Sequence, residues 1–320
     1  MFSRGKTMNS ARQSGYVCGL SFCILIMLKS PCAFGLSAEH SFSEPEIVKS
    51  AAIARRFGVF PLHNPVHLAE IYLPFVDALN EAAPELHLRF ESSAGYAAYE
   101  EKILKRELDF AIINPYQAMV AERRGYHVFA KMGDDFRMRG IIVVRKDSNI
   151  HGVRDLRGHR IAFPSTTAMA ATIMNKVYLQ QHGLNVEREM DVQYVNSQDS
   201  AILNVHAGLT VAGGTWPPAW DDMKARRPDI IKDLEIFSTT SSIPNLAVVA
   251  RDDIPAEQVE KLAKALAGLN ATANGRKVLS GLRVSSFEPA GRRTYLAVEP
   301  VIQAYRSYFG KLPLQTEITK

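Results

Sequence analysis

The stretch from Met138 to Thr167 constrains the fold of this chain more than any other. Residues 140–144 form an apolar, β-branched run, which is typical of a strand that is covered on both faces. Residues 153–158 indicate a one-turn helix that ends at a glycine, and residues 159–163 indicate a second strand. We therefore expect two buried strands joined by a short, partly helical connection.

A cluster of hydroxyl side chains follows the second strand. Ser165, Thr166 and Thr167 come directly after Pro164, and residues 168–181 after them favour a helix. Hydroxyl residues at a helix start usually cap its free N–H groups. The same arrangement of hydroxyls and N–H groups can also hold an oxyanion. Taken alone, the cluster favours the capping interpretation. The order of the surrounding strands and helices makes oxyanion binding a stronger candidate.

Strand and helix signals alternate along most of the chain. Further strands are expected at 56–61, 86–90, 109–113, 127–130, 192–195, 210–215 and 245–251. Such alternation predicts parallel sheets flanked by helices, with ligands bound beyond the carboxyl ends of the strands. The loops at His63, Gly95, Pro115 and Ser165 all lie at such ends.

The chain is expected to form two lobes. The apolar strand at 140–145 and a similar one at 245–251 bracket a block of about a hundred residues, as in a discontinuous domain. We assign 39–138 and 246–320 to the first lobe, with the C-terminal helices in the latter, and 139–245 to the second. The predicted fold class is α/β, with a mostly parallel sheet flanked by helices in each lobe and two hinge strands between them.

Residues 1–38 read as a signal peptide. Arg4, Lys6 and Arg12 precede a short apolar run at 17–28, and small residues follow. The run is short for a membrane span, which needs about 20 apolar residues. All three cysteines of the chain lie in this segment, so we expect an exported protein without disulfides or cysteine metal sites. Without its four basic residues the charge of the chain is nearly balanced, which gives no support for nucleic-acid binding.

Four segments carry a resemblance to a known family. They are GVFP at 58–61 with the helix expected after it, GYAAYEEKILKRELDFAIINPYQAM at 95–119, RGIIVVRKDSNIHGVRDLRGHRIAFPSTT at 139–167 and SIPNLAVVAR at 242–251. Together they resemble the periplasmic phosphonate, phosphite and phosphate binding proteins of ABC importers, which are two-lobed solute-binding proteins of type II. The resemblance implies a periplasmic protein, monomeric and without cofactor, that closes on a small oxyanion and presents it to an ABC permease with its ATPase.

The resemblance also assigns residues to the ligand site. Tyr96 matches the pocket tyrosine of the family, Ser165 and Thr166 match the hydroxyls that hold the phosphonate oxygens, and Thr167 extends that turn. Three positions depart from the family pattern. Gln198 stands where the family has a histidine, Leu246 stands where it has an acidic residue, and Trp216 stands where a small or acidic residue is usual. Since acids would hold an amino group on the ligand, an aminophosphonate is not favoured.

Other candidate site residues come from the sequence itself. Tyr116 follows Asn114-Pro115 at a strand end, and Trp216 stands next to two prolines that fix a loop exposing a large ring. Both are candidates for the cleft wall, although Trp216 could equally pack beneath its loop. His63 is a candidate donor at the pocket rim, against the alternative of a surface histidine.

We expect neither a metal site nor an enzyme. His63 and His67 are four residues apart, but Pro65 lies between them and the sequence places no third ligand nearby. The carboxylate pairs Glu100-Glu101 and Asp221-Asp222 read as solvated helix faces. The chain contains none of the common nucleotide, hydrolase or zinc-protease motifs.

Two alternatives to transport remain at this stage. The chain could be the ligand-sensing partner of a membrane sensor kinase, or it could bind a different small organic ligand through an aromatic pocket rebuilt around Trp216. A binding-protein-like enzyme acting on a pyrimidine-type ring is less favoured, because no base or nucleophile is evident.

Overall fold

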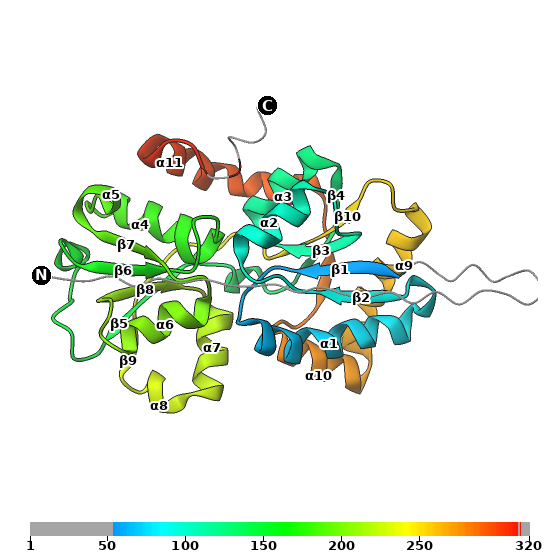
Figure 1. Ribbon diagram of the computed structural model, residues 1–320, viewed down its shortest axis with the longest axis horizontal. Coiled ribbons are helices and arrows are strands. Elements are labelled where there is room, and N and C mark those ends of the chain that lie inside the picture. The colour runs from blue at the N-terminus through cyan, green and yellow to red at the C-terminus, as the bar shows by residue number, and fades with distance from the viewer. Residues whose placement is uncertain (1–53, 313, 315–320) are drawn as a thin grey trace, which may run out of the picture. The chain divides into compact units, whose positions relative to one another are not determined.

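The computed structural model describes residues 54–312 and residue 314, so the predicted signal peptide lies outside the described residues. The described chain forms two sheets, each flanked by helices (Figure 1). The first sheet has the strand order β11-β4-β10-β3-β1-β2, and the second has the order β7-β6-β8-β5-β9. Each sheet, together with its helices, is one lobe.

The first lobe is built from both ends of the described chain. Its strands are β1 (Arg55–Val59), β2 (Leu88–Glu91), β3 (Phe110–Ile113), β4 (Tyr126–Met132), β10 (Ala247–Arg251) and β11 (Phe287–Pro289). Its helices are α1 (Pro65–Ala82), α2 (Tyr96–Leu104), α3 (Pro115–Ala121), α9 (Ala256–Gly268) and α10 (Ala273–Gly281). Strands β1 to β4 run in one direction, and β10 and β11 run in the other.

The second lobe is continuous in sequence. Its strands are β5 (Ile141–Arg145), β6 (Arg160–Phe163), β7 (Asp191–Tyr194), β8 (Ala212–Thr215) and β9 (Leu234–Thr239). Its helices are α4 (Asn175–Gln181), α5 (Val186–Glu189), α6 (Gln198–His206), α7 (Pro217–Arg226) and α8 (Pro228–Ile231), with a π-helical turn, Met169–Met174, before α4. Only β5 opposes the direction of the other four strands. The predicted fold class, two mostly parallel sheets flanked by helices, is confirmed.

Short 3₁₀ segments join several of these elements. They lie at Pro84–Leu86, Glu122–Arg124, Asp135–Arg137, Val153–Leu156, Leu269–Ala271 and Arg292–Val298.

Local sequence explains where the helices beside the inter-lobe region begin. The Asn64 side chain accepts a hydrogen bond from the His67 backbone, and Pro65 occupies the first helical position of α1, where no N–H is needed. Asn114 and Gln117 form a reciprocal capping box at the start of α3. Both helices therefore start at fixed points beyond β1 and β3.

The chain crosses between the lobes at two segments that bond to each other. Residues 138–140 lead into β5 and residues 240–246 lead into β10. The Thr240 N–H donates to the Gly140 carbonyl at 2.9 Å, and the Ile243 N–H donates to the Met138 carbonyl at 3.0 Å. The two connections thus form one short paired segment.

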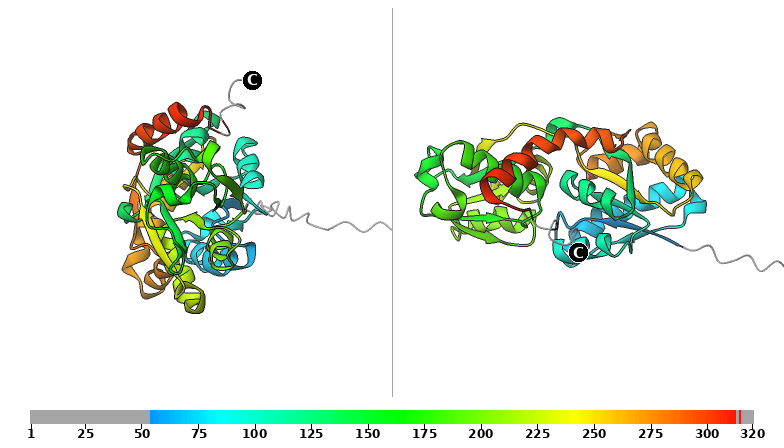
Figure 2. Two further views of the ribbon diagram at one scale, coloured as in Figure 1. Left: turned by 90° about the vertical axis from the view of Figure 1, so that its left-hand side faces the viewer. Right: turned by 90° about the horizontal axis from the view of Figure 1, so that it is seen from above.

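The C-terminal segment forms a third connection. The 3₁₀ segment Arg292–Val298 packs on α3 of the first lobe, and helix α11 (Glu299–Phe309) packs on α4 of the second. The Lys176 ammonium lies 5.5 Å from the ring centre of Tyr305 and 4.8 Å from that of Phe309. Figure 2 shows this segment (red) running from one lobe to the other.

In the part of the chain that is described, no helix has the length and apolar character needed to cross a membrane.

Gly214 in β8 offers a test of how tightly the second lobe is packed. A Cβ at this position would lie 2.2 Å from the Ala171 carbonyl oxygen and 2.4 Å from the Phe163 ring. We expect Gly214→Ala to lower the free energy of unfolding by about 1–3 kcal/mol, because a backbone atom must move. Urea unfolding measures the effect.

Gly268, the last residue of α9, provides the control, since a Cβ there would meet nothing within 4 Å. Gly268→Ala should leave stability unchanged or raise it by about 0.4–1 kcal/mol. Equal losses in the two variants would contradict the packing described for Gly214.

Candidate functional site

A small cavity of about 10 Å³ lies between the two lobes. The first lobe and its return segment contribute Phe60, Leu62, Tyr96, Asn114, Met138 and Leu246, and the second lobe contributes Ala168, Met169, Ala170, Ala171, Gln198 and Trp216. Most of this lining is apolar, and its polar groups are few and come from both lobes. That is the usual composition of a small-molecule site.

Tyr96 and Gln198 meet across the cavity. The Gln198 Nε2 donates to the Tyr96 hydroxyl at 3.4 Å, and the Gln198 Oε1 accepts a hydrogen bond from Thr215 at 2.9 Å. Both side chains are buried, and burial raises the pKa of Tyr96, so its hydroxyl remains protonated at neutral pH. The long bond between them is one that a ligand oxygen can replace.

Trp216 stands between β8 and α7, and its indole is buried with 6% of the residue exposed. Its Nε1–H has no hydrogen-bond partner among the described residues. Buried donors without a partner are uncommon in folded proteins, because the desolvation of the N–H is then uncompensated. The indole therefore has one donor available for a ligand.

The hydroxyl turn lies at the edge of the cavity rather than in its wall. Ser165 and Thr166 are half-buried and are not among the lining residues, whereas Thr167 is buried. The helix that follows begins after Ala168, with no side-chain cap, so the capping interpretation fails. The turn instead directs the start of this helix, residues 168–171, into the cavity, and the first N–H groups of a helix lack partners within it.

Thr167 is joined to a buried acid of the first lobe. Its hydroxyl donates to the Glu100 carboxylate, and the Gln117 amide donates to the same oxygen at 2.9 Å. The prediction that Glu100 is solvated is therefore wrong, although Glu101 beside it is exposed. Burial raises the pKa of Glu100, and the two hydrogen bonds offset only part of that rise.

Two residues near the turn differ from expectation. Tyr116 is buried but is not among the residues that line the cavity. Asn114, which the sequence analysis noted only as the residue before Pro115, lines the cavity and donates its amide to the Thr167 carbonyl at 3.1 Å. Its position directly after β3, at the carboxyl end of a strand, is the sequence signal that could have identified Asn114 as a site residue.

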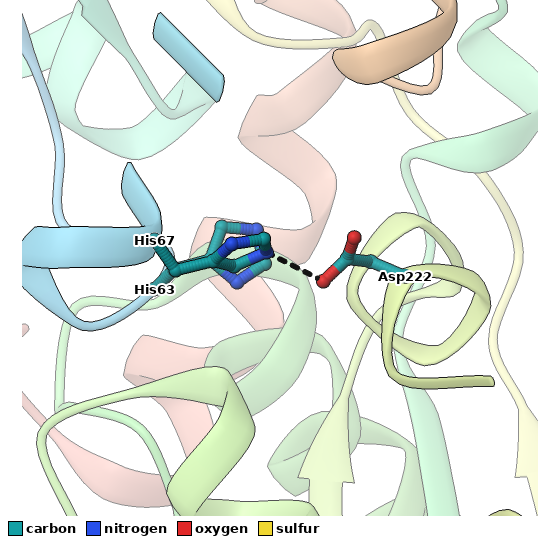
Figure 3. A group of neighbouring side chains, drawn as sticks. All are labelled: His63, His67 and Asp222. Carbon is teal, nitrogen blue, oxygen red and sulfur yellow. Dashed lines mark hydrogen bonds and ion pairs between the residues drawn. The ribbon is translucent and has the colours of Figure 1, made fainter. Parts of the chain in front are cut away.

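His63 lines a neighbouring cavity of about 20 Å³ rather than the rim of the first. Trp216 and Leu62 line both cavities and so form the wall between them. The His63 ring lies 4.7 Å from that of His67, centre to centre. Both histidines face acids of the second lobe, His63 facing Asp199 and His67 facing Asp222. Figure 3 shows the two histidines with Asp222.

Asp222 is buried among these groups, so its predicted solvation is also wrong. It lies 2.9 Å from the His67 Nε2 and 2.8 Å from the Arg226 Nε. Burial alone would raise the pKa of Asp222, but these hydrogen bonds outweigh it and hold the pKa below its usual range. The fold thus supplies a third potential ligand beside His63 and His67, contrary to the sequence-based expectation.

A cavity closed by polar groups from two lobes, with the chain crossing between them, defines a two-lobed solute-binding protein of type II. The family model for the phosphonate periplasmic substrate-binding protein of ABC transporters matches residues 57–295. The chain belongs to this family, whose members bind substrates for transport and are not enzymes.

Individual relatives agree with this assignment. The chain is 23% identical over 239 residues to a probable ABC transporter phosphite binding protein, PhnD1, of Prochlorococcus marinus. The aligned region covers 71% of this chain and 77% of that protein. Its fold is similar to that of a binding protein component of an ABC phosphonate transporter from Pseudomonas aeruginosa, with a TM-score of 0.74, 17% identity, and coverage of 82% of this chain and 91% of the other. The structure of PhnD1 from Prochlorococcus marinus in complex with methylphosphonate is also similar, with a TM-score of 0.71 and 20% identity. The match covers 78% of this chain and 97% of PhnD1.

The buried carboxyl of Glu100 should make stability depend on pH. Its raised pKa means that the folded state binds a proton more tightly than the unfolded state, so this group costs stability as the pH rises through the folded-state pKa. In Glu100→Gln, the amide oxygen can accept the same two hydrogen bonds without charge. We expect this variant to gain stability relative to the wild type as the pH rises above the ordinary pKa range of a glutamate carboxyl, as followed by denaturant unfolding.

Glu101→Gln is the matched control, because Glu101 is exposed and its pKa is lowered by Lys105. It should not reproduce the gain at high pH. A Glu100→Gln variant whose stability runs parallel to that of the wild type over this range would show that Glu100 does not titrate as a buried group.

Proposed function

We propose that this protein captures a small phosphorus oxyanion, a phosphonate, phosphite or phosphate, in the periplasm and delivers it to an ABC importer. The cavity between the lobes is the proposed site. The proposal rests on the polar groups that this cavity brings together. They are the side chains of Tyr96 and Gln198, the Trp216 N–H, which has no partner among the described residues, and the start of the helix at residues 168–171.

Neutral donors suit such a ligand. Hydrogen bonds to a charged group each contribute about 1.5–3 kcal/mol, and no full countercharge is needed when several converge. In this proposal the Tyr96 and Trp216 groups donate from opposite lobes, and the helix start adds backbone N–H groups. Ser165 and Thr166 take part by shaping the turn that positions this helix start, while Thr167 links the turn to Glu100.

Closure of the lobes follows from this division of the donors. A ligand that touches both lobes binds the closed state better than the open one, and it shifts the population by that difference in affinity. The paired crossing segments at 138–140 and 240–246 form the hinge in this mechanism. The closed protein is then the form presented to the permease.

The cavity lining favours a ligand that is small and partly apolar. Phe60, Met138 and Leu246 surround the polar groups, and they offer contact to a methyl group or a P–H bond but no partner to a fourth oxygen. We therefore expect methylphosphonate and phosphite to bind more tightly than phosphate.

Calorimetric titration of the purified protein with methylphosphonate, phosphite, phosphate and sulfate tests the proposal. A ligand present at one hundred times its Kd should also stabilise the fold by about 2.7 kcal/mol, which thermal unfolding detects. Binding of a phosphorus oxyanion but not sulfate supports the proposal. Absence of binding to all three phosphorus compounds would overturn it and favour a different organic ligand in the aromatic pocket.

Trp216→Phe should weaken binding of the preferred oxyanion at least tenfold. The variant keeps an aromatic wall but removes the N–H, and about 1.4 kcal/mol corresponds to one decade in Kd. Calorimetric titration measures the change.

Trp220→Phe is the matched control, because Trp220 belongs to the buried cluster of the second lobe and lines neither cavity. It should change stability but not affinity. Equal affinity in Trp216→Phe and the wild type would remove the indole N–H from the site.

Delivery to an importer is tested separately by uptake. A strain lacking this protein should lose import of the ligand that the titration identifies, and plasmid expression should restore it. Normal uptake combined with a lost transcriptional response would instead favour the sensing role.

A further inference from the structure

We infer that His63, His67 and Asp222 form a second site, which binds one divalent transition-metal ion of the zinc class between the lobes. This site lies outside the proposed oxyanion cavity and is separated from it by Trp216 and Leu62. His63 lies just before α1 and His67 lies in the first turn of α1, both in the first lobe, and Asp222 comes from α7 in the second (Figure 3).

The three side chains already gather their donor atoms. One ring nitrogen from each histidine and one carboxylate oxygen of Asp222 lie within 4.8 Å of one another. Zinc binds nitrogen and carboxylate oxygen at about 2.0–2.2 Å in a tetrahedron, which places neighbouring donor atoms about 3.4 Å apart. The His67 Nε2 and Asp222 Oδ2 are 2.9 Å apart, so small shifts of the side chains bring the donor atoms to the spacing that a bound ion requires.

Carboxylates behind both histidines orient the rings for metal binding. The His63 Nδ1 lies 3.3 Å from an oxygen of Asp199, and the His67 Nδ1 lies 3.1 Å from an oxygen of Glu70. Histidines that bind metals usually donate the other ring N–H to such a partner, which fixes the tautomer and makes the binding nitrogen more basic. Here both Nδ1 atoms are engaged, which assigns the Nε2 atoms to the ion.

The local charge suits a dication. Asp222 also accepts from Arg226 at 2.8 Å and lies 3.8 Å from Arg283, but a carboxylate has two oxygens and about four acceptor positions. With neutral histidines, the acids Glu70, Asp199 and Asp222 outnumber the two arginines. A metal ion would therefore be drawn to the site rather than repelled.

The site has room for a further ligand. Three protein ligands leave the fourth tetrahedral position of zinc to water, and the adjoining cavity of about 20 Å³ can hold one water molecule. Because its protein ligands belong to both lobes, a bound ion would tie the lobes together.

Titration with ZnCl₂ in phosphate-free buffer, after treatment of the purified protein with a chelator, tests the inference. We expect saturable binding of one ion per chain and a rise in the thermal midpoint that the chelator reverses. His67→Gln should weaken zinc binding at least tenfold. Asp199→Asn, which alters the carboxylate that faces His63 and Arg226 but removes no proposed ligand, should weaken it about tenfold.

The controls separate this site from general histidine binding and from misfolding. His127→Gln alters an exposed histidine paired with Asp252 and should leave zinc affinity unchanged. Circular dichroism verifies the fold of each variant, and Asp222→Asn, which retains an oxygen facing His67, replaces His67→Gln if that variant does not fold. The inference would be overturned if the wild type showed no saturable zinc binding. It would also be overturned if His67→Gln and Asp222→Asn bound zinc as tightly as the wild type.

Discussion

The arrangement of the protein depends on one constraint, the pairing of the two chain segments that cross between the lobes. Residues 138–140 and 240–246 bond to each other, and then enter the interior of their sheets as β5 and β10. Each of these strands is antiparallel to both of its neighbours. The crossing therefore fixes two sheets at once, and side chains at the ends of other strands converge between them.

Asn245 illustrates how firmly this crossing is held. Its side chain donates to the Gly133 carbonyl at 2.7 Å, its N–H donates to Asp135, and its carbonyl accepts from the Tyr295 hydroxyl at 2.6 Å. The residue is fully buried, so each of these polar groups needs a partner. Leu246, the next residue, lines the cavity, so the crossing segment and the candidate site are neighbours along the chain.

Much of the fold was predictable because local signals agreed with the tertiary structure. The β-branched runs at β5 and β10 are buried on both faces, and the Asn-Pro pairs before α1 and α3 mark helix starts. Glu100 and Asp222 were misread for a physical reason. Adjacent residues on a helix point about 100° apart, so one member of each acidic pair faces the interior, and the sequence does not say which. The partners of these acids, Thr167 and His67, lie 67 and 155 residues away and meet them only in the folded chain.

The C-terminal helix has a mechanical consequence. Lys176 rests against Tyr305 and Phe309, so α11 is fastened to the second lobe, while the 3₁₀ segment before it packs on the first. Two paired strands alone permit both bending and torsion about their common direction. The C-terminal segment is a third connection at a different place, so it resists the torsion, and bending becomes the easier motion. In the proposed closure, the lobes would then rotate about a single fixed axis. Residues 298–299, where the 3₁₀ segment becomes α11, would bend each time the lobes open and close.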